Sequence, residues 1–370
     1  MIKRGADDKF QVAMRAVLFA LGALLAACAT ASTATPAGAE AGAVNNGPAP
    51  VTAVGDLHGD FDAYFSILRN ARLIDRNGRW VGKTAKLVQL GDVADRGPDS
   101  KRIIDHLMRL QGQATRSGGE VVALIGNHEA MNVSGDLRYV HPGEYAAFVS
   151  RRSPAARDAF YSQNEEAFRS FYRQRDPEMT DADVRAAFDE DYPLGYVEHR
   201  RAWSPDGAIG RWVVGNDAIR VIGRTLFVHG GVSADVTATP INEINERIQL
   251  ALRNGAPDEL VTGERSPLWF RGYSLGEGAA EADVSAALAA YDVDRIVVAH
   301  TPQLSGIATY HGGRVVVVDT GISAFYGGTR SYLRIDGDTL VAVNDGLASE
   351  LPGIAGVGSG TGSGEAEGVK

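Results

Sequence analysis

The chain has almost no cysteine. Its single residue of this type, Cys28, stands near the N-terminus of a sequence of 370 residues. One thiol cannot form an intramolecular disulfide, so the fold has to be held by non-covalent contacts. Cys28 also precedes every polar motif in the chain, which excludes chemistry that depends on a cysteine nucleophile.

Long apolar runs and runs of basic residues are also missing. The apolar run Ala16–Ala27 has 12 residues and is too short to span a bilayer. The formal net charge is −9, and no cluster of lysine and arginine follows the N-terminus, so nucleic acid is not expected as a partner. At 44% hydrophobic residues, the chain can build one large core or two.

Four short polar motifs occur in a fixed order, and each follows a short apolar run. They are Gly55–Gly59 (GDLHG), Gly91–Gly97 (GDVADRG), Gly126–Glu129 (GNHE) and His229–Gly231 (HGG). A further histidine, His300, follows the run Ile296–Ala299. Runs of this kind predict buried parallel strands that end in turns. Ligands bind at the carboxyl ends of such strands, so the motifs are expected to converge on one site.

The same reading predicts an α/β fold. Strands are expected at Val51–Val54, Leu87–Leu90, Val121–Ile125 and Leu226–Val228. The segments after the first two motifs have the periodicity of amphipathic helices. Later strands, expected to be antiparallel, are predicted at Arg314–Asp319, Tyr332–Asp336 and Leu340–Asn344.

The motifs supply oxygen and nitrogen ligands without a thiolate. Asp56 and His58 are two residues apart, so in a turn both can face one ion, and an aspartate such as Asp92 can bridge two ions. A second ion would be completed by Asn127, His229 and His300. This donor set suits manganese, iron or zinc better than a soft metal. Two such ions, about 3.5–4 Å apart, stabilise an in-line displacement and activate a bound water as its nucleophile.

Three further motif residues fit acid catalysis and phosphate binding. His128 directly follows a proposed ligand, but a histidine held by a carboxylate is a good proton donor, and Asp95 is the nearest candidate partner. Arg96 is expected to hold a phosphate group through two hydrogen bonds.

Taken together, the motifs resemble the phosphoprotein-phosphatase branch of the calcineurin-like metallophosphoesterases, and in finer detail the bacterial Shewanella-like protein phosphatases. Supporting matches are Gly126–Asn132, Gly135–Pro142, Phe227–Gly231, Pro267–Tyr273 and Asp319-Thr320-Gly321, and the resemblance covers roughly residues 50–345. It implies a sandwich of two central mixed sheets flanked by helices, with a mostly helical insert. It also implies phosphomonoester hydrolysis on a phosphoprotein or phosphopeptide, at phosphotyrosine or at phosphoserine and phosphothreonine.

The resemblance also implies a role for each site residue. The first metal ion is assigned to Asp56, His58 and Asp92, and the second to Asp92, Asn127, His229 and His300. His128 is implied as the general acid, supported by Asp95, while Arg96 and Arg271 clamp the phosphate. The implied cofactors are two divalent ions, with manganese preferred and iron or zinc as alternatives. Thr301 and Pro302 follow His300 without the second histidine of many relatives, so the first ion should have fewer protein ligands.

The catalytic domain is predicted at residues 50–350, interrupted at 132–224 by a mostly helical cap. Helices are predicted there at Ala155–Arg175 and at Asp181–Asp189, the latter behind a capping pair at Thr180. The cap is rich in tyrosine and arginine, which could wall a pocket for a planar leaving group and so favour phosphotyrosine. The residues in question are Tyr139, Tyr145, Tyr161, Tyr172, Tyr192, Tyr196, Arg138, Arg151, Arg152, Arg200 and Arg201. The alternative is that they lie scattered on helix surfaces and the cap only stabilises the sandwich.

Two single residues near the third motif and in the cap also carry expectations. Glu129 is expected to hydrogen-bond to a loop rather than to touch metal. His199, beside Arg200 and Arg201, is expected to face solvent.

The N-terminal segment reads as an export signal. Residues 1–28 combine a cationic start with the apolar run, and Leu25-Ala26-Ala27-Cys28 resembles a bacterial lipobox whose cysteine becomes lipidated. Cleavage after Ala31 or Ala34 is the alternative. Residues 29–49 are expected to be a flexible linker and 351–370 a disordered tail. The expected location is the periplasm, with a lipid anchor at Cys28 in the outer membrane, because Ala29 lacks the acidic residue associated with inner-membrane retention.

Two other functions remain open from the sequence. One is hydrolysis of dinucleoside polyphosphates, because enzymes of that class share the Asp319-Thr320-Gly321 feature. The other is a non-catalytic, metal-binding surface lipoprotein. The GNHE motif and the long insert favour a phosphatase over the first, and the intact His128, Asp95 and Arg96 argue against the second.

Overall fold

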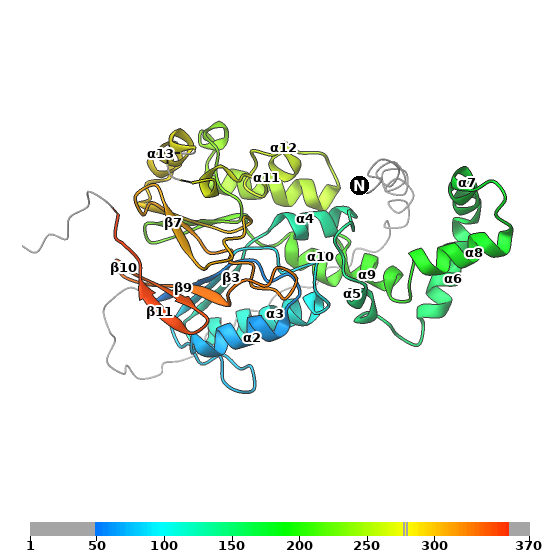
Figure 1. Ribbon diagram of the computed structural model, residues 1–370, viewed down its shortest axis with the longest axis horizontal. Coiled ribbons are helices and arrows are strands. Elements are labelled where there is room, and N and C mark those ends of the chain that lie inside the picture. Colours follow the sequence, from blue (N-terminus) through cyan, green and yellow to red (C-terminus); the bar gives the residue numbers. More distant parts are fainter. Residues whose placement is uncertain (1–48, 277, 279, 355–370) are drawn as a thin grey trace, which may run out of the picture.

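The computed structural model describes residues 49–354 except 277 and 279. Two β-sheets lie face to face at the centre of the main body, with helices on their outer sides (Figure 1). The first sheet has the order β11-β10-β9-β1-β2-β3 and the second has the order β4-β5-β6-β8-β7. Both sheets are mixed, as the sequence predicts.

Parallel strands carry the motifs in both sheets. In the first sheet, β1 (Val51–Val54) pairs in parallel with β2 (Lys86–Gln89), which pairs in parallel with β3 (Glu120–Ala123). Its antiparallel strands are β9 (Ser331–Asp336), β10 (Thr339–Asn344) and β11 (Leu347–Glu350). In the second sheet, β5 (Thr225–Val228), β6 (Arg295–Val298) and β8 (Val315–Val317) run parallel. The antiparallel edges of that sheet are β4 (Ile219–Ile222) and β7 (Ala308–Tyr310). The expectation of an antiparallel strand over 314–319 is therefore wrong for the pairing of β8 with β6 and holds only for its pairing with β7.

Alternating side chains of the strands divide the core into layers. Val51 and Ala53 of β1 belong to a buried cluster between the sheets, whereas Val54 belongs to a larger cluster that includes the helices. The cluster between the sheets takes Val88 from the first sheet and Val316 from the second. This two-sided burial explains why the motif strands read as nearly continuous apolar runs.

Helices cover the outer faces of the two sheets. The first sheet carries α2 (Phe61–Asn70) and α3 (Ser100–Arg116), and the second carries α11 (Ile241–Asn254), α12 (Glu259–Thr262) and α13 (Glu281–Tyr291) (Figure 1). The helix α2 begins at a good cap, since the Asp60 side chain accepts the amide hydrogen of Ala63 at 2.9 Å. A short helix, α4 (Asn127–Ser134), begins inside the third motif.

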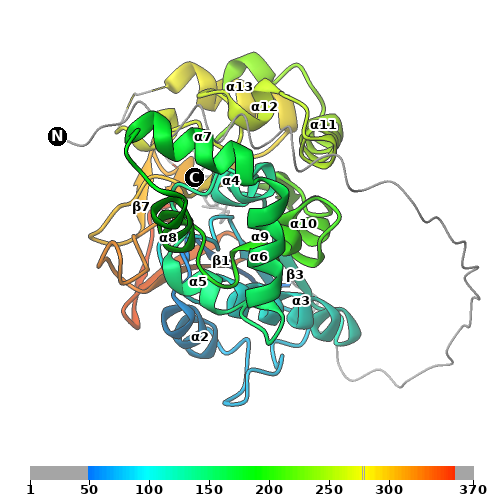
Figure 2. The same ribbon diagram turned by 90° about the vertical axis from the view of Figure 1, so that its right-hand side faces the viewer.

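The insert between the third and fourth motifs is mostly helical, as predicted. It contains α5 (Pro142–Ala146), α6 (Ser153–Gln163), α7 (Glu165–Arg175), α8 (Asp181–Asp191), α9 (Tyr196–Trp203) and α10 (Ala208–Val213). The helices α6, α7 and α8 project from the main body, while α9 and α10 return the chain to it (Figures 1 and 2). The projecting helices share an aromatic core that includes Phe160, Phe168 and Phe188. The capping box at Thr180 is present at the start of α8.

Two details of the insert differ from the sequence prediction. The single helix predicted over 155–175 is divided at Asn164, whose side-chain amide donates to the carbonyl of Phe160 at 2.9 Å and so ends α6. The helical part also ends at Val213 rather than at residue 224. The strand β4 follows and forms a hairpin with β5 around Gly223, which has a φ of 59°.

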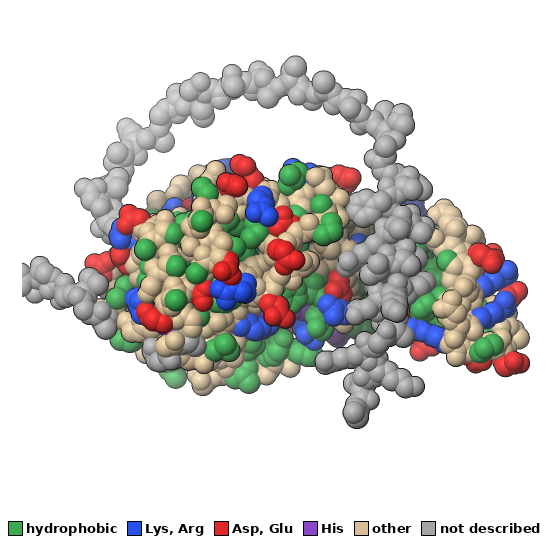
Figure 3. All heavy atoms as spheres, turned by 90° about the horizontal axis from the view of Figure 1, so that it is seen from above, with side chains coloured by type: hydrophobic (Ala, Val, Ile, Leu, Met, Phe, Trp, Pro, Cys, Tyr) green, Lys and Arg blue, Asp and Glu red, His purple; other side chains and the backbone are tan. Residues whose placement is uncertain are grey.

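Charged side chains of both signs are interspersed on the face shown in Figure 3, including the outer end of the insert. There, Arg173 Nη2 lies 2.6 Å from Asp181 Oδ1, and Arg185 Nη2 lies 2.5 Å from Asp158 Oδ1. Exposed pairs of this kind contribute only about 0–1 kcal/mol each. The projecting helices are therefore held together mainly by their aromatic core.

None of the helices in the described part of the chain is both long enough and apolar enough to cross a bilayer. The proposed export segment, the lipobox with Cys28 and residues 29–48 of the linker lie outside the described residues. The same is true of residues 355–370 of the tail.

Candidate active site

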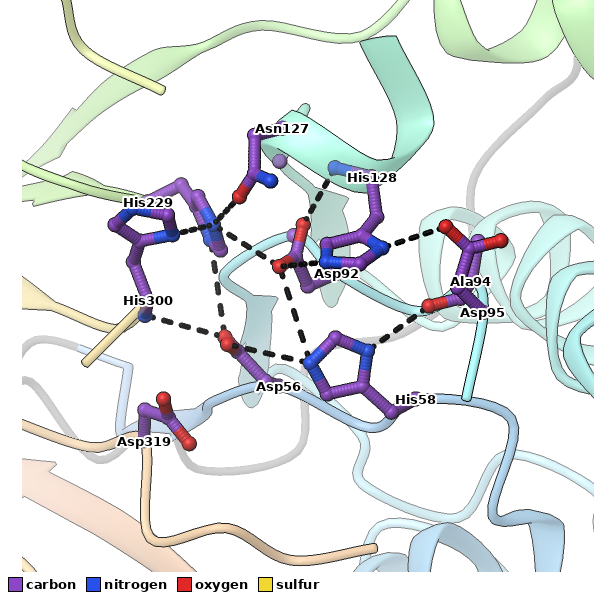
Figure 4. Close-up of polar contacts among 12 residues, drawn as sticks. Asp56, His58, Asp92, Ala94, Asp95, Asn127, His128, His229, His300 and Asp319 are labelled. Atoms are coloured by element: carbon purple, nitrogen blue, oxygen red, sulfur yellow. Dashed lines mark hydrogen bonds and ion pairs between the residues drawn. The ribbon is translucent and has the colours of Figure 1, made fainter. Parts of the chain in front are cut away.

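The four motifs and His300 meet at the carboxyl ends of the parallel strands (Figure 4). Asp56 follows β1, Asp92 follows β2, and Asn127 begins α4 just after β3. From the second sheet, His229 directly follows β5 and His300 follows β6. Residues separated by up to 244 positions therefore face one another at one edge of the sandwich.

The backbone of the site adopts conformations that residues other than glycine rarely take. The φ angle is positive at five site residues: His58 (44°), Asp92 (53°), Asp95 (71°), Arg96 (66°) and His300 (66°). Such angles persist only where the surroundings fix them, and they cluster at functional sites. Gly126 permits a close approach as well, because a Cβ atom there would lie 2.3 Å from Asp92 Oδ1.

Ligand-type atoms form two overlapping groups, one of His58, Asp92 and His128 and the other of Asp92, His229 and His300. His58 Nε2 lies 3.9 Å from Asp92 Oδ2 and 3.8 Å from Asp56 Oδ2, so Asp56 adjoins the first group. Asp56, His58 and Asp92 are each no more than 3% exposed. The first two motifs thus direct two carboxylates and one imidazole at a common point.

The second group is centred on His229. Its Nε2 lies 3.0 Å from Asn127 Oδ1, 3.1 Å from His300 Nδ1 and 3.3 Å from Asp92 Oδ2. A single ring nitrogen cannot hydrogen-bond well to three such atoms at once. Their convergence is instead what a shared cation would require.

Backbone carbonyls fix the orientation of two of these histidines. His58 Nδ1 lies 3.0 Å from the carbonyl oxygen of Ala94, and His229 Nδ1 lies 2.8 Å from that of Leu90. Each Nδ1–H can donate to its carbonyl, which leaves Nε2 with a lone pair directed into the site. Metal-binding histidines are typically held in this way.

The electrostatics of the site favour a bound cation. Burial, together with the neighbouring carboxylates of Asp319 and Asp92, raises the pKa of Asp56 well above its ordinary value. Burial raises the pKa of Asp319 to about 6, and its Oδ2 is buried without a hydrogen-bond partner. Burial and the nearby His128 lower the pKa of His58 to about 3, so its ring is neutral, as a metal ligand must be. Buried carboxylates beside the neutral imidazole of His58 therefore fit a divalent cation.

His128 belongs to the first group and is also held by a carboxylate. Its Nδ1 lies 2.5 Å from Asp95 Oδ2, while its Nε2 lies 3.8 Å from Asp92 Oδ2. The second oxygen of Asp95 accepts the side-chain amide of Asn132 at 2.8 Å. The predicted pairing of His128 with Asp95 is therefore present in the structure.

Glu129 holds the second motif by its backbone. One carboxylate oxygen accepts the amide hydrogens of Val93 and Ala94 at 2.9 and 3.1 Å. The other accepts those of Asp92 and Gly126 at 2.8 and 2.9 Å. This agrees with the expectation that Glu129 bonds to a loop.

The two arginines predicted to bind phosphate have different contacts. The Arg96 guanidinium carbon stands 3.9 Å from the ring centre of Tyr139 and 4.9 Å from that of Phe325. Arg271 Nη1 donates to the carbonyl of His300 at 2.5 Å and lies 3.1 Å from Thr301 Oγ1. Arg271 thus contacts a metal-ligand candidate directly, whereas Arg96 contacts Tyr139, whose ring centre lies 5.2 Å from that of His128.

Aromatic side chains surround the site, but only one comes from the predicted tyrosine wall. Tyr139 lies 5.2 Å from His128 between ring centres, and Tyr326 lies 5.4 Å from His58. Phe325 and Tyr326 belong to a glycine-flanked loop after Asp319. Sequence reasoning missed this aromatic pair, although the adjacent glycines mark a turn beside a proposed motif.

The other tyrosines of the insert pack within it. Tyr161 and Tyr172 belong to the aromatic core of the projecting helices, and Tyr145 packs 5.6 Å from Tyr196. Arg138 pairs with Asp136 at 2.7 Å rather than pointing at the metal-ligand groups.

The expectation for His199 is wrong. Its side chain is completely buried, with ring centres 5.1 Å from Tyr145 and 5.2 Å from Phe148. The two adjacent arginines suggested an exposed stretch, but a helix turns its successive residues to different sides.

Comparison with known proteins agrees with this geometry. The family model described as calcineurin-like phosphoesterase matches residues 49–304. Shewanella-like protein phosphatase 2 of Arabidopsis thaliana is 31% identical over 290 residues, covering 75% of this chain and 72% of the relative. Shewanella-like protein phosphatase 1 of Plasmodium berghei is 28% identical over 307 residues, covering 79% and 73%.

A solved structure is also similar. The cold-active protein-tyrosine phosphatase of a psychrophilic Shewanella species superposes with a TM-score of 0.61 at 26% sequence identity. The match covers 82% of this chain and 81% of that protein. By family model, sequence relatives and fold, the chain belongs to the calcineurin-like phosphoesterases and, among them, to the Shewanella-like protein phosphatases, and it is a metal-dependent phosphatase.

Proposed function

We propose that the protein removes phosphate from phosphoproteins at a dinuclear metal centre. The observation that carries this proposal is the sharing of Asp92 by two groups of buried ligand-type atoms, together with the pairing of His128 and Asp95. Asp56 and His58 would hold the first ion together with Asp92. The second ion would be held by Asp92, Asn127, His229 and His300.

The chemistry divides between the metal ions and the side chains. Two divalent ions, when bound, neutralise phosphate charge and lower the pKa of coordinated water. Arg96 and Arg271 would bind the phosphate oxygens and orient the phosphorus atom. His128 would donate the proton on Nε2 to the leaving oxygen, because its Nδ1 is committed to Asp95. Asp95 would keep the ring in that orientation and stabilise its cationic form.

Manganese is the proposed metal, with iron or zinc as the alternatives. Support comes from the donor set, which contains carboxylate, amide and imidazole groups and no thiolate. Elemental analysis of the purified protein, followed by calorimetric titration of each ion into metal-free protein, measures both identity and stoichiometry. Less than one ion per chain for every metal tested would contradict the proposal.

Phosphotyrosine is the proposed substrate class. Tyr139, Phe325 and Tyr326 stand around the metal-ligand groups, and Arg96 lies between the first two rings. The faces of these aromatic rings would stack on the phenyl ring of phosphotyrosine. Phosphoserine has no ring to stack and holds its phosphate closer to the peptide backbone. The similar Shewanella structure is that of a protein-tyrosine phosphatase, which also supports the proposal.

Substitution of Tyr139 and Phe325 tests the substrate class. On matched phosphopeptides, the wild type is expected to have a higher kcat/KM for phosphotyrosine than for phosphoserine. Tyr139→Ala and Phe325→Ala should each reduce this preference by about 2–13-fold, the effect of losing an aromatic contact worth about 0.5–1.5 kcal/mol. Phe171→Ala is the matched control, because Phe171 lies on α7 and packs against Tyr172 in the insert.

Several outcomes of this assay would refute the proposal. Equal kcat/KM values on both peptides would leave a broad phosphomonoesterase. Hydrolysis of diadenosine tetraphosphate without release of phosphate from either peptide would favour the nucleotide enzyme. No turnover of any phosphoester by metal-loaded protein would favour the non-catalytic binding protein.

We also propose export to the periplasm with a lipid anchor at Cys28. The support is the order of charged, apolar and small residues in the N-terminal sequence. Cys28→Ala is expected to release the protein from membranes or to leave an uncleaved precursor, because Cys28 is the only cysteine available for acylation. Cell fractionation and the mass of the mature N-terminus measure both results. Membrane association and processing unchanged from the wild type would show that another residue directs cleavage.

A further inference from the structure

Two buried glutamates together hold four consecutive backbone amides of the second motif. Glu129 accepts the amide hydrogens of Asp92, Val93 and Ala94. The next amide, that of Asp95, donates to Glu144 Oε1 at 2.9 Å. Glu129 belongs to a motif, but Glu144 comes from α5, the first helix of the insert. The insert thus supplies one of the groups that fix the motif loop.

The surroundings of Glu144 are built for this contact. The residue is 1% exposed, and its Oε1 also accepts the hydroxyl of Ser100 at 2.8 Å. Its other oxygen, Oε2, lies 3.8 Å from Nε2 of the buried His199 on α9. Removal of a buried acceptor leaves its donors without partners, so an oxygen that accepts two hydrogen bonds at this depth is costly to lose. Glu144 therefore ties α5 of the insert to the start of α3 and to the motif loop at one atom.

The amide that Glu144 accepts belongs to a residue with a demanding conformation. Asp95 is fully buried and has a φ of 71°, which a residue with a side chain rarely adopts. The following amide, that of Arg96, is also held by the insert, since it donates to the carbonyl of Tyr139 at 3.0 Å. A backbone in such a strained conformation persists only where surrounding contacts hold it in place.

The conformation of Asp95 in turn decides where its carboxylate lies. One oxygen lies 2.5 Å from His128 Nδ1, and the other accepts the amide of Asn132 at 2.8 Å. The carbonyl of Asn132 accepts a further bond from the insert, at 2.6 Å from Arg200 Nη1. A shift of the Asp95 backbone would therefore misdirect the ring of His128 without removing either residue.

We propose that Glu144 is a positioning residue for the His128–Asp95 pair and that the insert thereby braces the proton donor. Glu144 acts through the backbone of Asp95 and does not touch substrate. The proposal rests on the proposed role of His128 as general acid.

Three substitutions of Glu144 distinguish the effect of side-chain length from the effect of charge. Glu144→Gln keeps an oxygen that can accept both hydrogen bonds, so its kcat should stay close to that of the wild type. Glu144→Asp keeps the charge but shortens the side chain, and Glu144→Ala removes the acceptor. For phenyl phosphate, these two variants should lose about 10–100-fold in kcat, the usual effect of removing an outer partner of a site residue. For 4-nitrophenyl phosphate, whose leaving group needs little protonation, the loss should be much smaller.

Matched controls show whether the effect is specific. Glu198→Gln changes another carboxylate of the insert, which accepts the hydroxyl of Ser153 at 2.6 Å, and it should leave both rates unchanged. Metal content and thermal unfolding are measured on every variant. In a His128→Asn background, Glu144→Asp should add no further loss that depends on the leaving group, because the two residues act on one step.

The outcomes separate this inference from the proposed function. A wild type without phosphatase activity would refute the function itself. If the wild type is active but Glu144→Asp loses the same factor on both phosphates, or loses nothing, the positioning role is refuted. The role is also refuted if Glu144→Gln is as impaired as Glu144→Asp, since the hydrogen bond would then not be the reason for the loss.

Discussion

Asp92→Asn is expected to abolish phosphatase activity and to lower the metal content of the protein. Asp92 Oδ2 lies 3.3 Å from His229 Nε2 and 3.9 Å from His58 Nε2, between the two groups of candidate ligands. A carboxylate can bridge two cations with its two oxygens, whereas an amide offers one weaker oxygen and no charge. Because the substitution preserves shape, the loss should come from metal binding rather than from packing.

Three measurements check the Asp92 prediction independently of turnover. Elemental analysis gives the ions per chain, calorimetry gives their affinity, and thermal unfolding with and without chelator gives the stabilisation by metal. All three should decrease in Asp92→Asn. Glu120→Gln is the matched control. Glu120 lies at the start of β3, away from the motifs, and its carboxylate pairs with Lys86 at 2.7 Å. Full metal content with a near-normal rate in Asp92→Asn would remove the shared-ligand assignment.

Local patterns in the sequence predict the α/β fold, the motif strands and the metal-ligand candidates, whereas the sandwich of two mixed sheets follows from the family resemblance. Each motif strand is a short apolar run that stops at a glycine or polar residue. The ends of these strands are less certain, since pairing rather than composition sets them. The run Leu87–Leu90 predicts the second strand, but the ladder with β1 places β2 at Lys86–Gln89.

What the sequence does not predict depends on contacts between distant residues. The edge strand β4 has the partly polar sequence IRVI and is defined by its pairing with β5. His199 is followed by two arginines in the sequence, but aromatic rings surround it in the fold. The tyrosines of the insert were predicted to line the pocket. One of them, Tyr139, does stack on Arg96 next to the site. Periodicity cannot distinguish a tyrosine that faces the site from one that packs within the insert.

Glu144 illustrates the same limit for residues that support the site. Its partner is a backbone amide 49 positions away, and a backbone amide has no sequence signature. Glu129 performs the same kind of task, but it lies three residues from Gly126 inside a motif and could be assigned to a loop contact. Site residues that lie within a motif can therefore be predicted from one sequence. Residues that support the site through a distant backbone amide can be identified only in the folded structure.

His128→Asn is expected to keep both metal ions and to reduce kcat by about 10²–10⁴-fold, the usual contribution of a general acid. The ring is held at Nδ1 by Asp95, so Nε2 is the atom that can deliver a proton. The loss should be largest for alkyl phosphates, whose leaving oxygen has a high pKa, and smallest for 4-nitrophenyl phosphate.

The metal content of His128→Asn distinguishes a general acid from a metal ligand. His128 Nε2 lies 3.8 Å from Asp92 Oδ2, and His128 forms a group of ligand-type atoms with His58 and Asp92, so its position would also suit a metal ligand. His141→Asn is the matched control: His141 caps α5 by accepting the amide hydrogen of Gly143 at 3.0 Å, and asparagine is a favoured residue at such a cap. If His128→Asn loses an ion, His128 is a ligand. If it keeps its metal but loses the same factor on alkyl and nitrophenyl phosphates, proton donation is not its role. The general-acid role is supported only if His128→Asn retains its metal and loses more kcat as the pKa of the leaving group rises. A leaving group of higher pKa depends more on protonation, which is the step assigned to His128.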